Sequence, residues 1–326
     1  MRVTVAVPDW AQQLASDDTD MERAPVPLEP SETPTVDFEV PDDGYFEYGF
    51  VDAQGKLRAD PSNSVKADNP WYPSASALSG PDYRPEPLST PDRGLERGQR
   101  DRLRLTSAAL GGQLRRVNVY TPSGQEGAPL PLVVVQDGVA FDRLAGIHLV
   151  AEALVARGEA RPARFAFVEP VDRREEYGYS DAYLEFLLSE LLPAVETVGP
   201  GTGENVWLGA SLGGLASANA ALTRPDLAAS VVTFSGAFLG DPEHKEYYAT
   251  RNSRLLERLR DQQTELPARW YLEVGTIEWL TDINRSVHAA LEARGVETAM
   301  VERHAGHNWT NWRNGMAPAL RFALKP

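Results

Sequence analysis

Cysteine is absent from the 326-residue sequence. Disulfide bonds, thiolate zinc sites and cysteine nucleophiles are therefore excluded, because each of them needs a thiol. Long apolar runs are missing as well, since no window approaches the roughly 18 uncharged residues of a membrane span. The opening residues MRVTVAVPDW also lack the apolar run of a secretory signal. We therefore expect a cytoplasmic protein that has no membrane partner.

Positive charge is scarce relative to negative charge. The sequence holds 32 Lys and Arg against 47 Asp and Glu, a formal net charge of -15. Such a surface repels nucleic acid and anionic membranes, so we expect neither as a partner. Residues 1–95 contain seven Lys and Arg against 18 Asp and Glu, a balance of 7 − 18 = -11 that leaves -4 for the rest. The acidity is therefore concentrated in the front segment.

The front segment also holds 13 of the 25 prolines, which disfavours long helices and central strands. Residues 2–7, 35–40 and 45–52 are the candidate strands, and 81–102 has the Pro, Arg and Gly content of a linker. We predict a small, acidic β-sandwich-like domain over residues 1–95 and a catalytic domain over 96–326. The front domain is expected to act as a lid or spacer, with carbohydrate binding as the alternative.

From about residue 100, short apolar runs alternate with segments of helical periodicity, which is typical of a buried, mostly parallel sheet. This alternation predicts a doubly wound α/β fold with its chemistry at the carboxyl ends of the strands. Residues 114–120 read as an antiparallel entry strand. The predicted parallel strands are 132–136, 165–168, 206–209, 230–234, 270–274 and 298–301. The predicted helices are 142–157, 181–195, 212–223 and 283–294.

The segment Gly209-Ala210-Ser211-Leu212-Gly213 fits the pattern G-x-S-x-G between a predicted strand and a predicted helix. Small neighbours let a serine occupy a strained turn there. We predict Ser211 as the nucleophile of an acyl transfer, with the backbone N–H of Leu212 as an oxyanion donor. The second donor is expected in the loop after residues 132–135, at Gly138 and Val139. A plain glycine-rich turn is the alternative interpretation.

A serine needs a base and an acid, which this fold supplies further along the chain. Of the five histidines, His148 and His244 do not follow late strands and His288 lies within a predicted helix, which leaves His304 and His307. We favour His307, because Gly306 frees the loop to turn its ring over the sheet edge. These two histidines have no obvious third ligand, so we expect no metal, and no cofactor is implied.

The acid is expected after the strand 270–274. Glu278 lies in the loop Gly275-Thr276-Ile277-Glu278 and would orient the imidazole. Asp282 is the alternative, although aspartate at the start of a helix is often an N-cap.

Five segments between about residue 100 and residue 326 resemble the enterochelin esterase branch of the putative esterase, or esterase D-like, α/β-hydrolases. They are VVVQDGVAF, VDRREEYGYSDAYLEFLLSELLPAVE, GASLGGLAS, YLEVGTIEWLTDINRSVHAAL and HAGHNWTNWR. The stretch DFEVPDDGYFEYGFVDAQGKLRADPSNS of the front domain resembles the immunoglobulin-like early-set sandwich that precedes such catalytic domains. The resemblance implies an α/β-hydrolase fold and the triad Ser211, Glu278 and His307.

The resemblance also implies a substrate class, because siderophore-type members cleave the esters of ferric catecholate trilactones. Arg173, Arg174 and Arg313 would then face the polyanionic ligand, and Trp309 and Trp312 would stack on it. The alternative for the first two arginines is surface pairing with Glu175 and Glu176. Feruloyl or acetyl esters are the alternative substrates, and a catalytically silent binding protein of the same fold is the alternative function.

Overall fold

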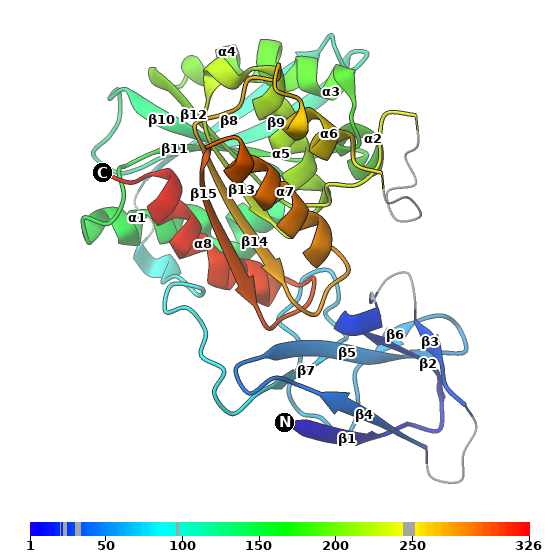
Figure 1. Cartoon of the computed structure of the whole chain (residues 1–326). Helices are drawn as coiled ribbons and strands as arrows, with labels where there is room; N and C mark the ends of the chain where they lie inside the picture. Colours follow the sequence, from blue (N-terminus) through cyan, green and yellow to red (C-terminus); the bar gives the residue numbers. More distant parts are fainter. Residues whose placement is uncertain (20, 22–24, 30–33, 96–97, 244–251) are drawn as a thin grey trace. The chain divides into compact units, whose positions relative to one another are not determined.

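The protein is described from a computed structural model that covers residues 1–19, 21, 25–29, 34–95, 98–243 and 252–326 (Figure 1). His244 lies outside the described residues. The chain forms two compact units. The first contains Met1–Glu86 with Val274–Thr281 and Glu302–Asn314, and the second contains Pro87–Glu273, Asp282–Val301 and Gly315–Pro326. The sequence boundary near residue 95 stays a prediction.

The first unit contains the strands of the predicted β domain (Figure 1). β1 (Arg2–Ala6) and β4 (Thr35–Glu39) pair antiparallel. A second sheet has the order β3-β2-β5-β6, with β7 also on β5. Its strands are β2 (Ala11–Ser16), β3 (Val26–Pro27), β5 (Tyr45–Asp52), β6 (Leu57–Arg58) and β7 (Ser76–Ser79). The three strands predicted from the sequence are confirmed to within one residue at their ends.

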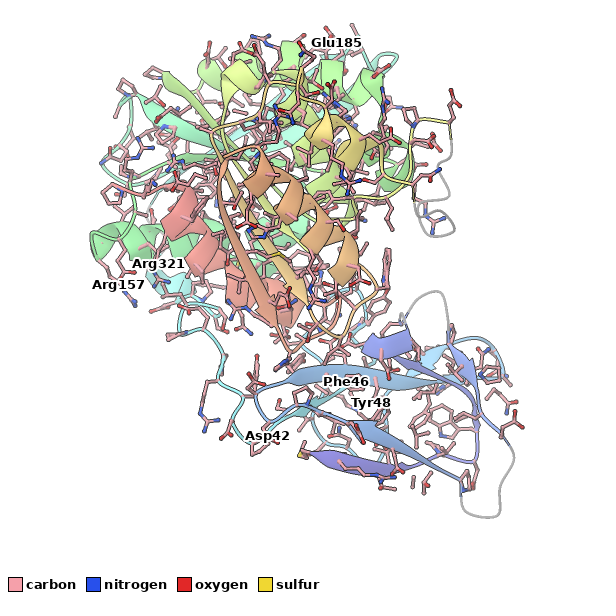
Figure 2. All side chains as sticks on the ribbon, viewed as in Figure 1. Asp42, Phe46, Tyr48, Arg157, Glu185 and Arg321 are labelled. Carbon is pink, nitrogen blue, oxygen red and sulfur yellow. The ribbon has the colours of Figure 1, made fainter. Side chains whose placement is uncertain are left out.

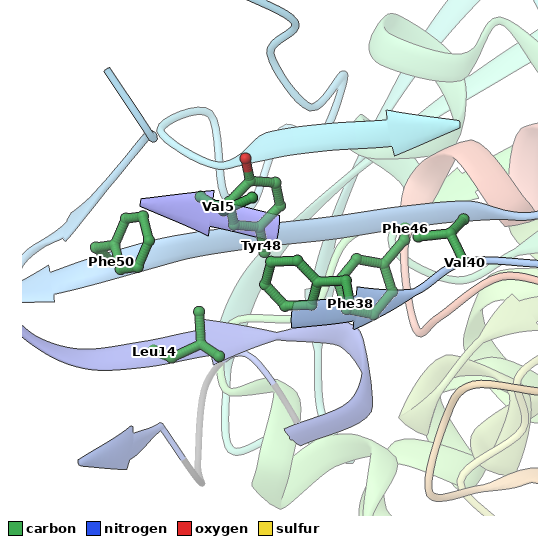
Figure 3. Close-up of a cluster of buried hydrophobic side chains, with 7 residues drawn as sticks. All are labelled: Val5, Leu14, Phe38, Val40, Phe46, Tyr48 and Phe50. Atoms are coloured by element: carbon green, nitrogen blue, oxygen red, sulfur yellow. The ribbon is translucent and has the colours of Figure 1, made fainter. Parts of the chain in front are cut away.

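An aromatic cluster forms the core of this unit (Figure 3). Phe46 and Tyr48 (both labelled in Figures 2 and 3) are two positions apart on β5, so they belong to the same face of the strand. Both rings pack on Phe38 of β4, with centroid distances of 5.1 and 4.9 Å. Ile277, from the segment that follows β14, packs against the same cluster. The core of the β domain therefore also anchors a piece of chain that is distant in sequence.

In the described part of the second unit, the main sheet has the order β15-β14-β13-β12-β10-β11-β9-β8. The pairs β10–β11, β10–β12, β12–β13 and β13–β14 are parallel, whereas β9 is antiparallel to β8 and β11. The predicted doubly wound sheet and its antiparallel entry strand are confirmed. The strands are β8 (Gln99–Ser107), β9 (Gln113–Thr121), β10 (Leu130–Val135), β11 (Arg164–Val168), β12 (Gly201–Ala210), β13 (Ala228–Phe234), β14 (Arg269–Gly275) and β15 (Glu297–Arg303).

The end of the predicted linker is wrong, because β8 already begins at Gln99. Its sequence QRDRLRLTS alternates arginine with leucine and is exposed at alternate positions, as expected of a strand at the edge of a sheet. The arginines on that exposed face give the strand the same composition as the linker before it, so the sequence does not separate the two.

The helices are α1 (Ile147–Ala156), α2 (Arg173–Tyr177), α3 (Asp181–Glu185), α4 (Leu192–Glu196), α5 (Leu212–Thr223), α6 (Arg254–Arg260), α7 (Thr281–Ala293) and α8 (Trp309–Ala323). The predicted helix 142–157 is broken at Gly146, whose φ of 68° separates a π-helical turn from α1. A π-helical segment likewise joins α3 to α4. None of the helices in the described ranges is long and apolar enough to cross a membrane. The cytoplasmic location stays a prediction.

Candidate active site

Ser211 lies in the tight turn between β12 and α5. Its φ of 56° and ψ of -124° are sterically unfavourable for a residue with a side chain. The backbone of Ser211 is held on both sides: its N–H donates to Phe234 O at 2.9 Å, and its carbonyl accepts from Ala237 N at 3.0 Å. β13 and the loop that follows it thus fix a strained serine, which is buried.

Close backbone contacts explain the glycines around Ser211. A Cβ on Gly209 would lie 2.3 Å from the carbonyl of Gly213, and a Cβ on Gly213 would lie 2.9 Å from Oδ2 of Asp137. The turn can therefore close only with glycine at position 209. Leu212 is the first residue of α5, so its N–H has no partner within the helix and points along the positive end of the helix dipole.

Arg173 fastens the loop after β10 to the turn that carries Ser211. Its Nε and Nη2 lie 2.8 and 2.9 Å from the two carboxylate oxygens of Asp137. Nη2 also donates to the carbonyl of Ala210 at 3.1 Å. Asp137 itself has a φ of 53°, so this loop is strained too. From the sequence, Arg173 was expected to contact the substrate or to pair with the neighbouring glutamates. In the structure its guanidinium binds Asp137 and the carbonyl of Ala210 instead.

Gly138 and Val139, the predicted second oxyanion donors, follow Asp137. A Cβ on Gly138 would lie 2.5 Å from the backbone of Phe167, so the loop presses directly on β11. The N–H of Val139 donates to Oε2 of Glu169 at 2.9 Å. Burial raises the pKa of the Glu169 carboxyl, and the hydrogen bond from Val139 opposes this. The sequence analysis missed Glu169, although its place directly after β11 was a usable signal.

Glu278 and His307 form a hydrogen-bonded pair within the first unit. Oε2 of Glu278 lies 2.5 Å from Nδ1 of His307, and Oε1 accepts the N–H of Gly275 at 2.8 Å. The carboxylate is fully buried and can only accept hydrogen bonds, so Nδ1 carries a hydrogen and Nε2 is left as the basic nitrogen. Asp282, the alternative acid, has a side chain that is 98% exposed, and Arg285 is its neighbour at 3.6 Å. The structure therefore brings His307 together with Glu278.

The remaining described histidines have other partners. Nδ1 of His304 lies 2.6 Å from Asp43, and Nδ1 of His148 lies 3.5 Å from Asp142. His288 lies 3.1 Å from Thr298 on β15. Over the described ranges, no three His, Asp or Glu side chains are grouped so that they could hold a metal ion.

Tryptophan rings surround His307. Trp312 contacts the imidazole edge-on at a centroid distance of 5.1 Å, and the ring of Trp279 is tilted against it at 5.8 Å. Trp309 and Trp312 have no exposed surface and pack on Trp71. A ring with no exposed surface cannot stack on a ligand, so this arrangement does not support the substrate contacts expected for these two residues.

Arg313, the last residue expected to contact substrate, is paired within the first unit. Its guanidinium binds the side chain and the carbonyl of Asp68. The Arg313 side chain is 12% exposed, so most of it is covered by protein. An anionic ligand would have to compete with Asp68 for this guanidinium. The arrangement therefore does not support the substrate contact expected of Arg313.

The β domain supports the loop of His307 through Asp17, a residue that the sequence analysis missed. Oδ2 of Asp17 accepts the N–H of Glu47 at 2.7 Å and Nδ2 of Asn308 at 3.1 Å. A Cβ on Gly306 would lie 2.0 Å from Cγ of Asp17, so glycine is required there because of this contact. Burial, followed by the charge of Glu47, raises the pKa of Asp17 well above its ordinary value. In the sequence, Asp17 belongs to an acidic run that looks solvated.

Comparison with known proteins identifies a family. A sequence model of the putative esterase family matches residues 107–323. The iron(III) enterobactin esterase of Dickeya dadantii is 29% identical over 290 residues, which cover 82% of this chain and 65% of that protein. The iron(III) salmochelin esterase of Escherichia coli O6:H1 is 25% identical over 285 residues, covering 83% of this chain and 68% of that protein. The chain thus spans slightly less than two thirds of the first of these relatives.

Solved structures show the same fold. The ferric enterobactin esterase of Salmonella typhimurium superposes with a TM-score of 0.77 at 20% identity, covering 99% of this chain and 93% of that chain. The ferulic acid esterase of Anaeromyces mucronatus has a TM-score of 0.59 at 17% identity, covering 74% of this chain and 96% of that one. The α/β-hydrolase fold expected from the sequence is confirmed. By the family match over most of its length, the chain belongs to the putative esterase family.

Proposed function

We propose that the protein is a serine esterase that cleaves a carboxylic ester through an acyl-serine intermediate. The observation that carries the proposal is the strained turn of Ser211, which a plain βα connection would have no reason to maintain. Ser211 follows β12 and Glu278 follows β14, and both strands are parallel to β13 between them. Parallel strands end at the same edge of a sheet, so this order supports a common site for the two residues.

In the proposed reaction, Oγ of Ser211 attacks the ester carbonyl while Nε2 of His307 takes the hydroxyl proton. Glu278 holds the ring and stabilises the imidazolium that forms. The tetrahedral oxyanion accepts hydrogen bonds from the N–H groups of Leu212 and Val139. The alcohol then leaves with the proton from His307, and a water molecule, deprotonated by the same nitrogen, releases the acid and restores Ser211.

The hydrogen bond between Val139 and Glu169 gives this reaction a particular requirement. The N–H of Val139 has to leave the Glu169 carboxylate before it can donate fully to an oxyanion, because one N–H donates well to only one acceptor. The raised pKa of Glu169 makes loss of its charge easier than for a glutamate whose pKa is not raised. Binding of substrate and displacement of Glu169 are therefore coupled in this proposal.

The substrate that we infer is a siderophore ester of the enterobactin type. The named activities of the relatives from Dickeya dadantii and Escherichia coli support this choice. Feruloyl esters are the comparison class.

The test is hydrolysis of four esters by the purified protein: ferric trilactone, iron-free trilactone, a feruloyl sugar and p-nitrophenyl butyrate, each followed by mass spectrometry of the products. We expect turnover of the trilactone and the p-nitrophenyl ester, both lost in Ser211→Ala. Activity on feruloyl sugar without trilactone cleavage would remove the siderophore substrate. Failure to hydrolyse any ester by folded protein would contradict the esterase function and favour a binding protein.

A further inference from the structure

A hollow of about 510 Å³ in the second unit is lined by arginines that the proposed reaction does not use. Arg102 and Arg104 come from β8, Arg116 comes from β9, and Arg143 comes from the π-helical turn after β10. Arg115 also contributes to the lining, but it is buried and paired with Glu176. The hollow is therefore strongly basic in a chain whose net charge is -15.

The four exposed arginines lack partners. Within the described residues, the side chains of Arg102, Arg104, Arg116 and Arg143 make no ion pair or hydrogen bond with the protein. Arg104 and Arg116 stand directly opposite each other in the β8–β9 register. Like charges at facing positions of an antiparallel pair destabilise it. The protein thus keeps unpaired positive charge at a place where it costs stability, although acidic residues outnumber basic ones in the chain.

The hollow lies near the carboxyl ends of the parallel strands, where the proposed chemistry takes place. In the register of β9 with β11, Val117 faces Val168, the last residue of β11, so Arg116 lies just beyond the end of that strand. The lining also includes Glu169 and Val139, the proposed oxyanion donor. A ligand in the hollow would therefore reach the loop on which an ester carbonyl is expected to be polarised.

We propose that this arginine hollow is a subsite that binds the negatively charged part of the ester substrate. The inference rests on the proposed esterase function and narrows its substrate to esters that carry several negative charges. Leaving out Arg115, which is paired with Glu176, the four other guanidinium groups and the carboxylate of Glu169 give the lining a formal charge of 4 − 1 = +3. Guanidinium stays charged at all relevant pH values, and its planar fork matches the paired oxygens of a catecholate or a carboxylate. Leu103, Leu114 and Val171 give the same hollow apolar surface for an aromatic ring.

The experiment compares the double variant Arg104→Gln/Arg116→Gln with the parent on a charged and a neutral ester. For ferric trilactone we expect kcat/KM to fall about 100-fold, roughly tenfold per arginine, mainly through KM. For p-nitrophenyl butyrate we expect a change of less than about twofold, because a neutral ester makes no use of the charges. Arg157→Gln, an exposed arginine at the end of α1, is the matched control and should change neither value (Figure 2).

A binding measurement separates this subsite from the esterase function. The ferric complex of a tricatecholate amide has no ester, so fluorescence quenching by it reports binding alone. We expect the Ser211→Ala protein to bind it, and the Arg104→Gln/Arg116→Gln substitutions to weaken that binding about 100-fold in the same background. Equal binding with and without the two arginines, or an equal loss of activity on both esters, would overturn the subsite. If the protein binds the ferric tricatecholate amide through these arginines but hydrolyses no ester, the subsite proposal stands and the proposed esterase function is refuted.

Discussion

Glu47, whose N–H binds the Asp17 carboxylate beneath the loop of His307, provides a quantitative test of buried charge in the β domain. Its side chain on β5 is fully buried, and burial raises its pKa from 4.5 to about 7, although hydrogen bonds from Asn69 and Tyr45 oppose the shift. A pKa raised from 4.5 to about 7 corresponds to about 3 kcal/mol of stability lost when the group is ionised. We predict that Glu47→Gln, which removes the ionisable group and keeps its size, stabilises the protein at high pH.

The sign of the pH dependence follows from which state holds the proton. Below about pH 4.5 the Glu47 carboxyl is protonated in both states, so its burial carries no ionisation cost. Between about pH 4.5 and 7 the unfolded chain loses this proton while the folded protein keeps it, so stability falls as the pH rises. Above about pH 7 the folded protein bears the full cost. The variant does not follow this fall, so the difference between the two proteins widens with pH.

The assay is the free energy of unfolding in urea at pH 5 and pH 8. We expect Glu47→Gln to gain about 2.5 kcal/mol relative to the parent between these two values, because a small part of the cost is already present at pH 5. Glu39→Gln, on the exposed face of β4, is the matched control and should stay within about 0.5 kcal/mol of the parent. A difference between Glu47→Gln and the parent that is the same at both pH values would refute the buried-charge explanation.

Four further substitutions test the geometry of the site. Gly209→Ala should destabilise the protein by about 3 kcal/mol and abolish esterase activity, because its Cβ meets the backbone of the Ser211 turn. A variant that keeps the parent's melting temperature and its activity would show that the turn does not require glycine at this position. Glu278→Gln should lower kcat by roughly 10³-fold or more, whereas Asp282→Ala should leave it within about twofold, and the reverse order would make Asp282 the acid. Arg173→Lys should lower kcat about tenfold with little change in KM, because lysine cannot bridge Asp137 and the serine turn at once; an effect on KM alone would indicate substrate binding.

Local patterns explain how much of this protein was predictable from its sequence. The turn of Ser211 was found because strand, motif and helix are consecutive, and its strain arises within a few residues. Glu278 and His307 are predicted by their order after the late strands, and the structure pairs them where they follow two neighbouring strands, β14 and β15. These features depend on chain order and on short-range periodicity, which a single sequence displays.

Features that depend on distant contacts were missed. The role of Asp17 arises from burial against Asn308, and nothing in its neighbours along the chain signals that burial. Trp312 was expected to face a ligand because an isolated sequence does not show which side of α8 is covered. α8 itself was overlooked because Pro318 lies inside it, and proline in a helix interior is usually disfavoured.

The most direct test of the central claim is covalent labelling of the nucleophile with a fluorophosphonate, located by peptide mass spectrometry. The account predicts a single modification on Ser211 in the folded protein, with labelling slowed strongly in His307→Ala and absent in Ser211→Ala. Labelling of a different residue, or none on Ser211 in folded protein, would contradict it.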